Sequence, residues 1–534
     1  MEKIKNYING KNSVKGATWI LIVTLTISNI LGMIRDHFLA QKIPTDLLDT
    51  YYTAFRLPDL IFNLLILGAI AAAFIPVFTQ YLSKEKKEEA WHIANSFLNI
   101  SILILIASCL LLAVFMPKLI PLLVPQFGLE KQELTIRLAR LMLLSPLFFG
   151  ISYIFGGILN SFKRFLAYST APLVYNISII IATLFLADKY NVWGIAVGVV
   201  IGAFLHMLIQ IPIAIKLGYR YQSSFDFHHS GVRKIFKLML PRTIGLGAMQ
   251  LMLLAFTFIA SGLAAGSIAI FSLADNIQTM PVVVFGTSFA TAIFPSLSES
   301  YSKGENERFL NYIWKGIRSI LYLLIPASIG VILLRAQIVR LILGSGFFGW
   351  DQTVSTANTL GYLALSLFAQ GLVSILARAF YAVHNTKTPM YISIISFASS
   401  IIFAFIFSPG MGVEGLGLAF SLGSFLNVIL LYIYLRMELP QMKKYEKNNL
   451  SFIAKILLAT VIMGLLVQFT KWFSGGLMGD LDRVWQVLTQ TLFSIFVGAG
   501  VYLSITWYLG CEEIMEIWSI IKKKFGFGVS QNEQ

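Results

Sequence analysis

The residues of this chain that can do chemistry are ionisable side chains inside strongly apolar segments. Arg35 and Asp36 stand together in "ILGMIRDHFLAQ", Arg56 lies in "FRLPDL", and Asp275 lies in "FSLADNIQTMP". On insertion scales each such charge costs about 2.5–3.5 kcal/mol at the centre of a bilayer, so charges that persist there usually line a cavity or an ion path. These residues therefore predict a polar cavity within apolar surroundings.

The depth of each charge decides how strongly it indicates a site. Asp275 lies about eight residues, or roughly 12 Å, into its apolar segment, too deep for a short side chain to reach the headgroups. For Asp275, a functional site is favoured over a structural ion pair with a neighbouring helix. Arg35, Asp36 and Arg56 lie near segment ends. There a functional site and simple snorkelling of the side chain to the membrane interface are equally favoured.

Two local expectations follow from helix geometry. Adjacent residues on a helix do not face each other, so Arg35 and Asp36 are expected to have different partners. Pro58 suits a first helical turn and disfavours helix in the residue before it. Arg56 is therefore expected at a helix start, on a junction between segments.

The elements that carry these charges are membrane helices. The chain has 534 residues, of which 57% are hydrophobic and 13% charged, whereas soluble domains are about half apolar and a quarter charged. Apolar runs of about 20 residues, the length that spans a bilayer, recur throughout. The sequence predicts an all-α polytopic membrane protein with fourteen transmembrane helices. Their expected ranges are 17–39, 55–82, 91–116, 134–160, 167–187, 191–215, 238–262, 267–295, 312–334, 357–383, 388–408, 412–435, 449–470 and 485–509.

The basic residues predict the orientation. With the N-terminus inside, most Lys and Arg of the connecting segments fall on the cytoplasmic side, among them Lys86 and Lys444, while Lys42 falls outside. Both termini are then cytoplasmic. Basic loops facing an anionic leaflet also account for the net charge of +15, so no nucleic-acid partner is expected.

An internal repeat organises the spans. "SPLFFG" at 145–150 matches "SLFAQG" at 366–371, and "WGIAVGVVIG" at 193–202 matches "EGLGLAFSLG" at 414–423, both at an offset of 221. "FIPVFTQYLSK" at 74–84 matches "IFPSLSESYSK" at 293–303 at an offset of 219. Duplicated six-helix lobes of equal orientation are typical of transporters with a site between them. The predicted domains are an N-lobe at 1–216, a cytoplasmic linker at 217–237, a C-lobe at 238–436, and two extra helices with a cytoplasmic tail at 437–534.

Several patterns carry no chemistry. Cys109 and Cys511 form no Cys/His cluster, so no metal site is expected, and His206 is expected to be packed. "GSGFFG" at 344–349 fits GxGxxG but lies between membrane helices, not in a βαβ unit. The spacing of Gly194, Gly198 and Gly202 predicts a close helix-packing seam.

Long stretches resemble the opening and central signatures of the MurJ/MviN family of bacterial lipid II flippases, in the superfamily of multidrug and polysaccharide-lipid exporters. The matching stretches are "SNILGMIRDHFLAQ", "LDTYYTAFRLPDLIFNLLILGAIAAAFIPVFTQY", "FSLADNIQTMPVVVFGTSFATAIFPSLSESY", "IVRLILGSGFFGWDQT" and "LARAFYAVHNTKTP". The resemblance covers nearly the whole chain. It implies fourteen helices in two six-helix lobes plus an extra pair.

The resemblance also implies the site. The family lines a central cationic cavity from spans one, two, seven and eight, and this chain departs from it where Asn276 replaces an Arg. Arg242, near the inner end of span seven, is expected to compensate. The residues expected to bind substrate are Arg35, Asp36, Asp49, Arg56, Arg242, Asp275 and Asn276, with no catalytic residue and no metal ligand.

The implied activity is movement of an undecaprenyl-pyrophosphate-linked peptidoglycan precursor, lipid II, from the inner to the outer leaflet by alternating access. The protein is expected to be a monomeric transporter of the bacterial cytoplasmic membrane, contacting membrane lipids. Membrane potential or an ion gradient would drive it without a cofactor. Two alternatives remain: a sibling exporter of another polyprenyl-linked glycan or a small cation, and a membrane enzyme acting on polyprenyl phosphates.

Overall fold

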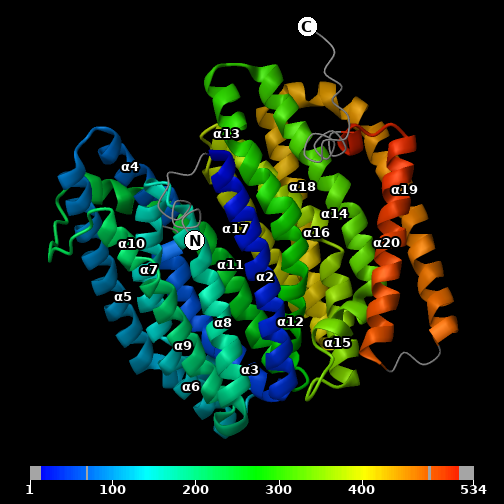
Figure 1. The fold of residues 1–534 in the computed structure, drawn as a ribbon, viewed down its shortest axis with the longest axis horizontal. Coiled ribbons are helices and arrows are strands. Elements are labelled where there is room, and N and C mark those ends of the chain that lie inside the picture. The colour runs from blue at the N-terminus through cyan, green and yellow to red at the C-terminus, as the bar shows by residue number, and fades with distance from the viewer. Residues whose placement is uncertain (1–13, 68–69, 479–482, 516–534) are drawn as a thin grey trace, which may run out of the picture. The chain divides into compact units, whose positions relative to one another are not determined.

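The protein is predominantly helical. The computed structural model describes residues 14–67, 70–478 and 483–515, and every regular element within these ranges is a helix (Figure 1). This confirms the predicted all-α class. The helices fall into two compact units.

The first unit comprises Met1–Ile277, Ile342–Thr359 and Met390–Phe420. Its elements run from α2 to α11 and into α12, and it includes most of α15 and α17 and the start of α18. Their bounds are α2 Val14–Lys42, α3 Thr45–Phe62, η1 Asn63–Leu67, η2 Ile70–Phe74, α4 Ile75–Ser83, α5 Lys87–Leu123, α6 Leu129–Met142, α7 Leu144–Ser161, α8 Phe165–Tyr190, α9 Val192–Leu208, α10 Ile211–Lys216, α11 Ser230–Ser261, α12 Ser267–Pro281, α15 Trp350–Ala364, α17 Lys387–Met411 and α18 Val413–Glu438.

The second unit comprises Gln278–Leu341, Leu360–Pro389 and Ser421–Gln534. It holds the rest of α12, α15 and α18 and the first three residues of α17. Its further elements are η3 Val282–Thr287, α13 Ser288–Ser302, α14 Asn306–Ile342, α16 Leu367–Ala382, η4 Pro440–Met442, α19 Lys443–Met478 and α20 Val484–Tyr508.

Close packing of α2 on α8, and of α8 on α9, builds the wall that carries Arg35. Side chains added at Gly194, Gly198 or Gly202 of α9 would collide with α8. The small residues therefore let the two backbones approach, as the predicted packing seam requires.

The helix that carries Arg56 runs straight through Pro58. Pro58 is buried inside α3, and Arg56 sits well within that helix, so the expectation of a helix start there was wrong. Packing of α3 against α6 and α7 outweighs the local preference of proline. The irregularity comes five residues later, where the helix widens into the π-helix η1.

Two of the three π-helices in the described residues, η1 and η3, begin at positions related by the offset of the internal repeat. The segment η1 begins at Asn63 and η3 begins at Val282, which is 219 residues later. Single-turn π-helices are rare and often mark functional positions. Both repeats thus bear the same interruption at matching positions.

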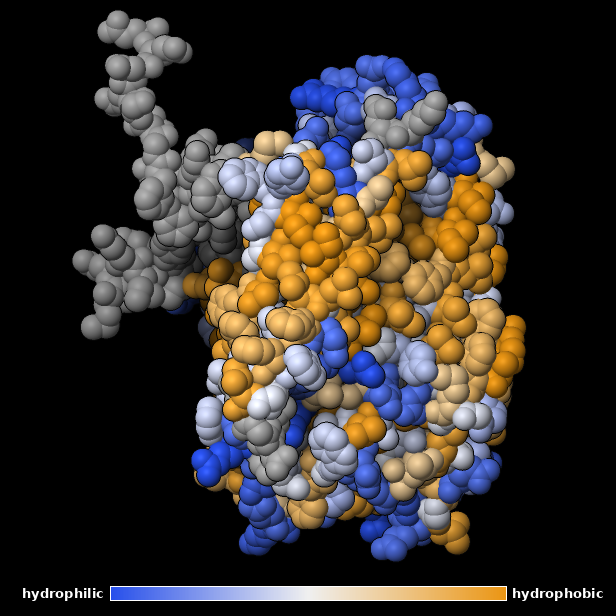
Figure 2. Space-filling view, turned by 90° about the vertical axis from the view of Figure 1, so that its right-hand side faces the viewer, coloured by the Kyte–Doolittle hydropathy of each residue, from blue (hydrophilic) through white to orange (hydrophobic). Residues whose placement is uncertain are grey.

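Eleven described helices are long and apolar enough to cross a membrane, or twelve if the bent pair α15–α16 forms one span. Neither α2 nor the interrupted segment α3–α4, which correspond to the first two expected spans, is among them, so fourteen stays a prediction. Many large apolar side chains are exposed on these helices. Figure 2 shows them gathered in a broad patch on the face that carries α19 and α20, with hydrophilic residues beyond it at both ends.

The predicted linker divides into two parts. Residues 217–229 run without a helix, and α11 begins at Ser230, earlier than the expected 238. Asn95 and Asn99 of α5 hold the non-helical part through hydrogen bonds to Arg220 and Gln222. Because α11 packs on α3, α5, η1 and η2, the first unit extends beyond the predicted N-lobe. The division into lobes stays a prediction.

Candidate functional site

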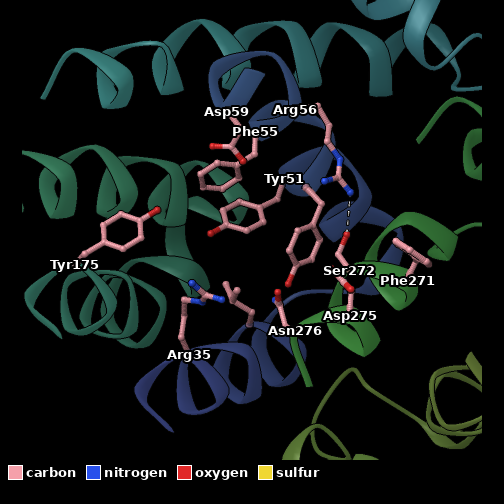
Figure 3. A pocket seen from close by; sticks show the side chains of 12 residues that line it. Arg35, Tyr51, Phe55, Arg56, Asp59, Tyr175, Phe271, Ser272, Asp275 and Asn276 are labelled. Carbon is pink, nitrogen blue, oxygen red and sulfur yellow. Dashed lines mark hydrogen bonds between the residues drawn. The ribbon is translucent and has the colours of Figure 1, made fainter. Parts of the chain in front are cut away.

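A cavity of about 240 Å³ lies within the first unit, between α2, α3, α8 and α12. Figure 3 shows the side chains of Arg35, Arg56, Asp275 and Asn276 pointing into it from three of these helices. Residues that are 240 positions apart in the sequence therefore meet. Four of the seven expected binding residues line one cavity.

Arg35 is held by a carboxylate. Its Nε and Nη2 donate to Oδ1 of Asp36 at 2.9 and 2.8 Å, and its Nη1 donates to Oδ1 of Asn176 on α8 at 3.2 Å. Asn276 of α12 donates to the other carboxylate oxygen of Asp36 at 2.9 Å. The Asp36 side chain is 3% exposed, whereas that of Arg35 is 20% exposed, so this network joins α2, α8 and α12 around a buried carboxylate at the edge of the cavity.

The expectation that Arg35 and Asp36 have different partners was wrong. Their Cβ atoms do diverge, but the long arginine side chain curves back to reach its neighbour. A buried carboxylate without a cation is strongly unfavourable. The burial of Asp36 therefore outweighs the geometric preference.

Arg56 has a different environment. Its Nε donates to the hydroxyl of Thr257 on α11 at 2.9 Å, and its Nη2 donates to the hydroxyl of Ser272 on α12 at 3.4 Å. Among the described residues, no carboxylate lies within 4.0 Å of its guanidinium, although the charges of Asp59 and Asp275 act on it. Arg56 therefore presents a positive charge that its hydroxyl partners do not neutralise.

Asp49 lies beside the start of α12, not among the lining residues of the cavity. Its two oxygens accept from the backbone N–H groups of Gly266 and Ala269 at 2.8 and 2.9 Å, and Lys131 lies 3.2 Å from one of them. A carboxylate here caps the helix and complements its dipole. Its expected part in substrate binding stays a prediction.

Of the remaining expected residues, some line the cavity and others do not. Asp275 lines the cavity together with Ser272 (Figure 3). Asp36 is not among the lining residues and is bonded to Arg35, which is. Arg242 belongs to α11, but its side chain lies outside the described part of the structure, so its compensating role stays a prediction.

The aromatic part of the cavity was not predicted from the sequence. Tyr51, Tyr52 and Phe55 of α3 and Tyr175 of α8 line it together with Asp59 (Figure 3). The Tyr52 hydroxyl is buried without a hydrogen-bond partner among the described residues. The placement of the first three at i−5, i−4 and i−1 from Arg56 was a signal that could have been used, whereas nothing in the sequence pointed to Tyr175.

Other polar groups lie apart from the cavity lining. His206 is buried, hydrogen-bonded to Ser152 at 2.7 Å and stacked on Tyr153, which confirms that it is packed. Within the described ranges, no group of three or more His, Cys, Asp or Glu is placed to hold a metal ion.

Comparison with known proteins identifies the family of this chain. The model of the family described as "Lipid II flippase MurJ" matches residues 45–480. The chain belongs to this family. A "Probable lipid II flippase MurJ" of Rickettsia prowazekii is 30% identical over 467 residues, covering 85% of this chain and 90% of that protein. One of Bdellovibrio bacteriovorus is 29% identical over 515 residues, covering 95% and 97%.

Solved structures agree with this assignment. A lipid II flippase MurJ in an inward closed conformation matches with a TM-score of 0.75 and 25% identity, over 92% of this chain and 98% of that one. An inward-facing multidrug resistance MATE family transporter of the MOP superfamily matches with a TM-score of 0.65 and 18% identity, over 80% of this chain and 99% of that one. The second likeness shows a shared fold alone.

Proposed function

We propose that this protein is a lipid II flippase that carries the undecaprenyl-pyrophosphate-linked peptidoglycan precursor from the inner to the outer leaflet of the bacterial cytoplasmic membrane. Family membership and relatives named as lipid II flippases support this activity. The single structural observation that carries it is Arg56, whose guanidinium lies in a cavity and, among the described residues, donates hydrogen bonds to two neutral hydroxyls.

A pyrophosphate cannot cross hydrocarbon unshielded, so a carrier must supply donors that replace water. Guanidinium groups suit this task because their planar fork binds phosphate oxygens in pairs. Thr257 and Ser272 are weaker partners than a phosphate and would yield Arg56 to it. Arg35 is less available, since the substrate would have to displace Asp36. Arg56 is therefore the proposed primary anion ligand.

Asp275 is proposed as a gating residue. A carboxylate repels pyrophosphate, but its charge acts on Arg56. An Asp275–Arg56 pair in one state of the cycle, opened when substrate takes the arginine, would couple binding to movement of the lobes. A double-mutant cycle on thermal stability tests this idea, and additive effects of the two substitutions to Ala would leave Asp275 with a structural role.

The driving force is proposed to be the membrane potential or an ion gradient. With the cytoplasm negative, each elementary charge moved outward gains about 2.3 kcal/mol per 100 mV. Two phosphate charges gain twice that. The protein is proposed to act as a monomer that contacts lipid II and the surrounding lipids.

The activity is tested by depleting the protein in its native host and following cell-wall growth. Loss of a lipid II flippase should stop growth and accumulate lipid II in the inner leaflet. Wild type and Lys42→Ala should restore export, whereas Arg56→Ala should not. Lys42 is a matched control because it is a basic residue paired with Asp188 at the surface. Growth without lipid II accumulation would favour a sibling exporter.

The orientation is tested by cysteine labelling. Cys109 and Cys511 are buried and would be replaced by Ser in the background. Cysteines at Lys86 and Lys444 should then be labelled only from the cytoplasmic side, and one at Lys42 only from outside. External labelling at position 86 would overturn the proposed topology with both termini cytoplasmic.

A further inference from the structure

The second unit contains a polar pocket that shares no lining residue with the proposed substrate cavity. It has a volume of about 340 Å³ and lies between α14, the start of α19, and the segment that follows α20. Arg318 and Lys315 line it from α14, and Glu512 and Glu513 line it from the segment after α20. Two cations and two carboxylates make the charged lining neutral overall.

Arg318 is fixed in place at the centre of this pocket. Its Nε donates to Oε1 of Glu513 at 2.6 Å, and its Nη2 lies 3.1 Å from Oε2 of Glu512. The guanidinium also lies over the ring of Phe452, 4.6 Å from the ring centre. Its position is therefore set by three residues on two other elements.

Two buried polar atoms of the pocket are left without a hydrogen bond. Nε1 of Trp314 and Oε2 of Glu513 have no partner among the residues that the structure describes. Trp314 is 7% exposed, and the Glu513 side chain is 11% exposed. A buried donor or acceptor without a partner is unfavourable, so a ligand that reached these two atoms would satisfy one donor and one acceptor.

The level of the pocket along the helices matches a membrane interface. Arg318 is twelve residues beyond Asn306, the start of α14, so it lies about 18 Å along the helix. The whole helix of 37 residues is about 55 Å long, which exceeds a bilayer with its headgroups at about 40–45 Å. If α14 is centred on a hydrocarbon core of about 30 Å, Arg318 lies about 5 Å inside the edge of that core, close enough for its long side chain to reach the headgroups.

We propose that this pocket binds a zwitterionic aminophosphate group, as in the headgroup of phosphatidylethanolamine. The primary ammonium would donate to Oε2 of Glu513 and to Glu512, and a phosphate oxygen would accept from Nε1 of Trp314 beside Arg318. A neutral lining that holds both signs of charge suits a zwitterion better than an anion. A quaternary ammonium has no N–H to donate, so phosphatidylcholine would not satisfy Glu513.

The test uses the full-length protein in delipidated form, titrated with single lipids and followed by native mass spectrometry and by thermal unfolding. Phosphatidylethanolamine should bind and stabilise more strongly than phosphatidylcholine or phosphatidylglycerol. Trp314→Phe keeps an aromatic ring but removes one hydrogen bond, and should weaken phosphatidylethanolamine binding about tenfold. Glu513→Gln should weaken it at least as much.

The matched control is the surface pair Lys444–Glu307, which is 3.9 Å apart and about four-fifths exposed. Lys444→Gln with Glu307→Gln should leave lipid preference unchanged. Soluble glycerophosphoethanolamine distinguishes the sources of the ligand: competition at equal concentration would assign the site to a free zwitterion instead of a lipid. Equal binding of all three lipids, or a Trp314→Phe variant that is less stable yet keeps the wild-type preference, would overturn the proposal. Arg318 and its two carboxylates would then act only as a structural clamp.

Discussion

Arg35 and Arg56 line the same cavity, yet they differ in what their charges do. Arg35 is bonded to Asp36, and Asp36 in turn to Asn276, so its charge is used within the protein. Arg56 is bonded to two hydroxyls and keeps its charge available. Two arginines that look equivalent in the sequence therefore differ in their partners, and we propose separate tasks for them, Arg35 in joining helices and Arg56 in binding an anion.

The largest effect is expected from Arg56→Ala, on transport. Losing two charge-assisted hydrogen bonds to a phosphate, each worth about 1.5–3 kcal/mol, corresponds to at least about 100-fold weaker binding. Lipid II export measured in a depleted strain should fail, whereas the thermal stability of the purified protein should change little. Arg56→Lys should retain part of the activity. Export at the wild-type rate by Arg56→Ala would break the comparison.

Arg35→Ala is expected to act on stability instead. It leaves Asp36 buried without its cation, at a cost of about 3–5 kcal/mol. Adding Asp36→Asn removes the uncompensated charge and should restore part of the loss, as measured by unfolding in detergent. Arg35→Lys should be poorly tolerated because it cannot bond in two places at once. A double variant no more stable than Arg35→Ala would argue against this account.

Asp49→Ala extends the comparison of Arg35 and Arg56 to a third charged residue, one that does not line the cavity. It removes the cap of α12 and should cost about 0.5–2 kcal/mol of stability. Export should fall only as far as the amount of folded protein falls. A loss of export in fully folded protein would instead support the predicted contact of Asp49 with substrate.

The smallest effect is expected from Asp226→Asn, in the segment between α10 and α11. Hydrogen bonding to His92, together with the backbone N–H groups of His228 and His229, holds the pKa of the Asp226 carboxyl below its ordinary value. A lowered pKa stabilises the folded state at pH values above the ordinary one, and that stabilisation is lost as the pH falls through the folded-state pKa. Thermal unfolding of Asp226→Asn and wild type should therefore differ slightly at neutral pH, and the difference should shrink as the pH falls below the ordinary carboxyl pKa of about 3.9. A difference that grows on acidification would contradict this.

The sequence predicted the helices and the charged residues of the site better than it predicted helix boundaries. The apolar runs predicted membrane helices, and the charges at Arg35, Arg56 and Asp275 predicted a polar cavity, which the structure contains. Helix boundaries were less certain, as α11 shows by starting at Ser230. The course of α3 through Pro58 was not predictable locally, because tertiary packing decides whether a proline ends a helix.

The sequence by itself determined the class, the family and the identity of the principal charges, because hydrophobic runs and residue types are properties of the chain alone. Only the tertiary structure decided the partner of each charge. A side chain several bonds long can reach its neighbour or another helix, and burial selects between them by the high cost of an unpaired charge. For that reason Asp36 faces Arg35, Asp49 faces the start of α12, and Arg56 donates to the hydroxyls of Thr257 and Ser272.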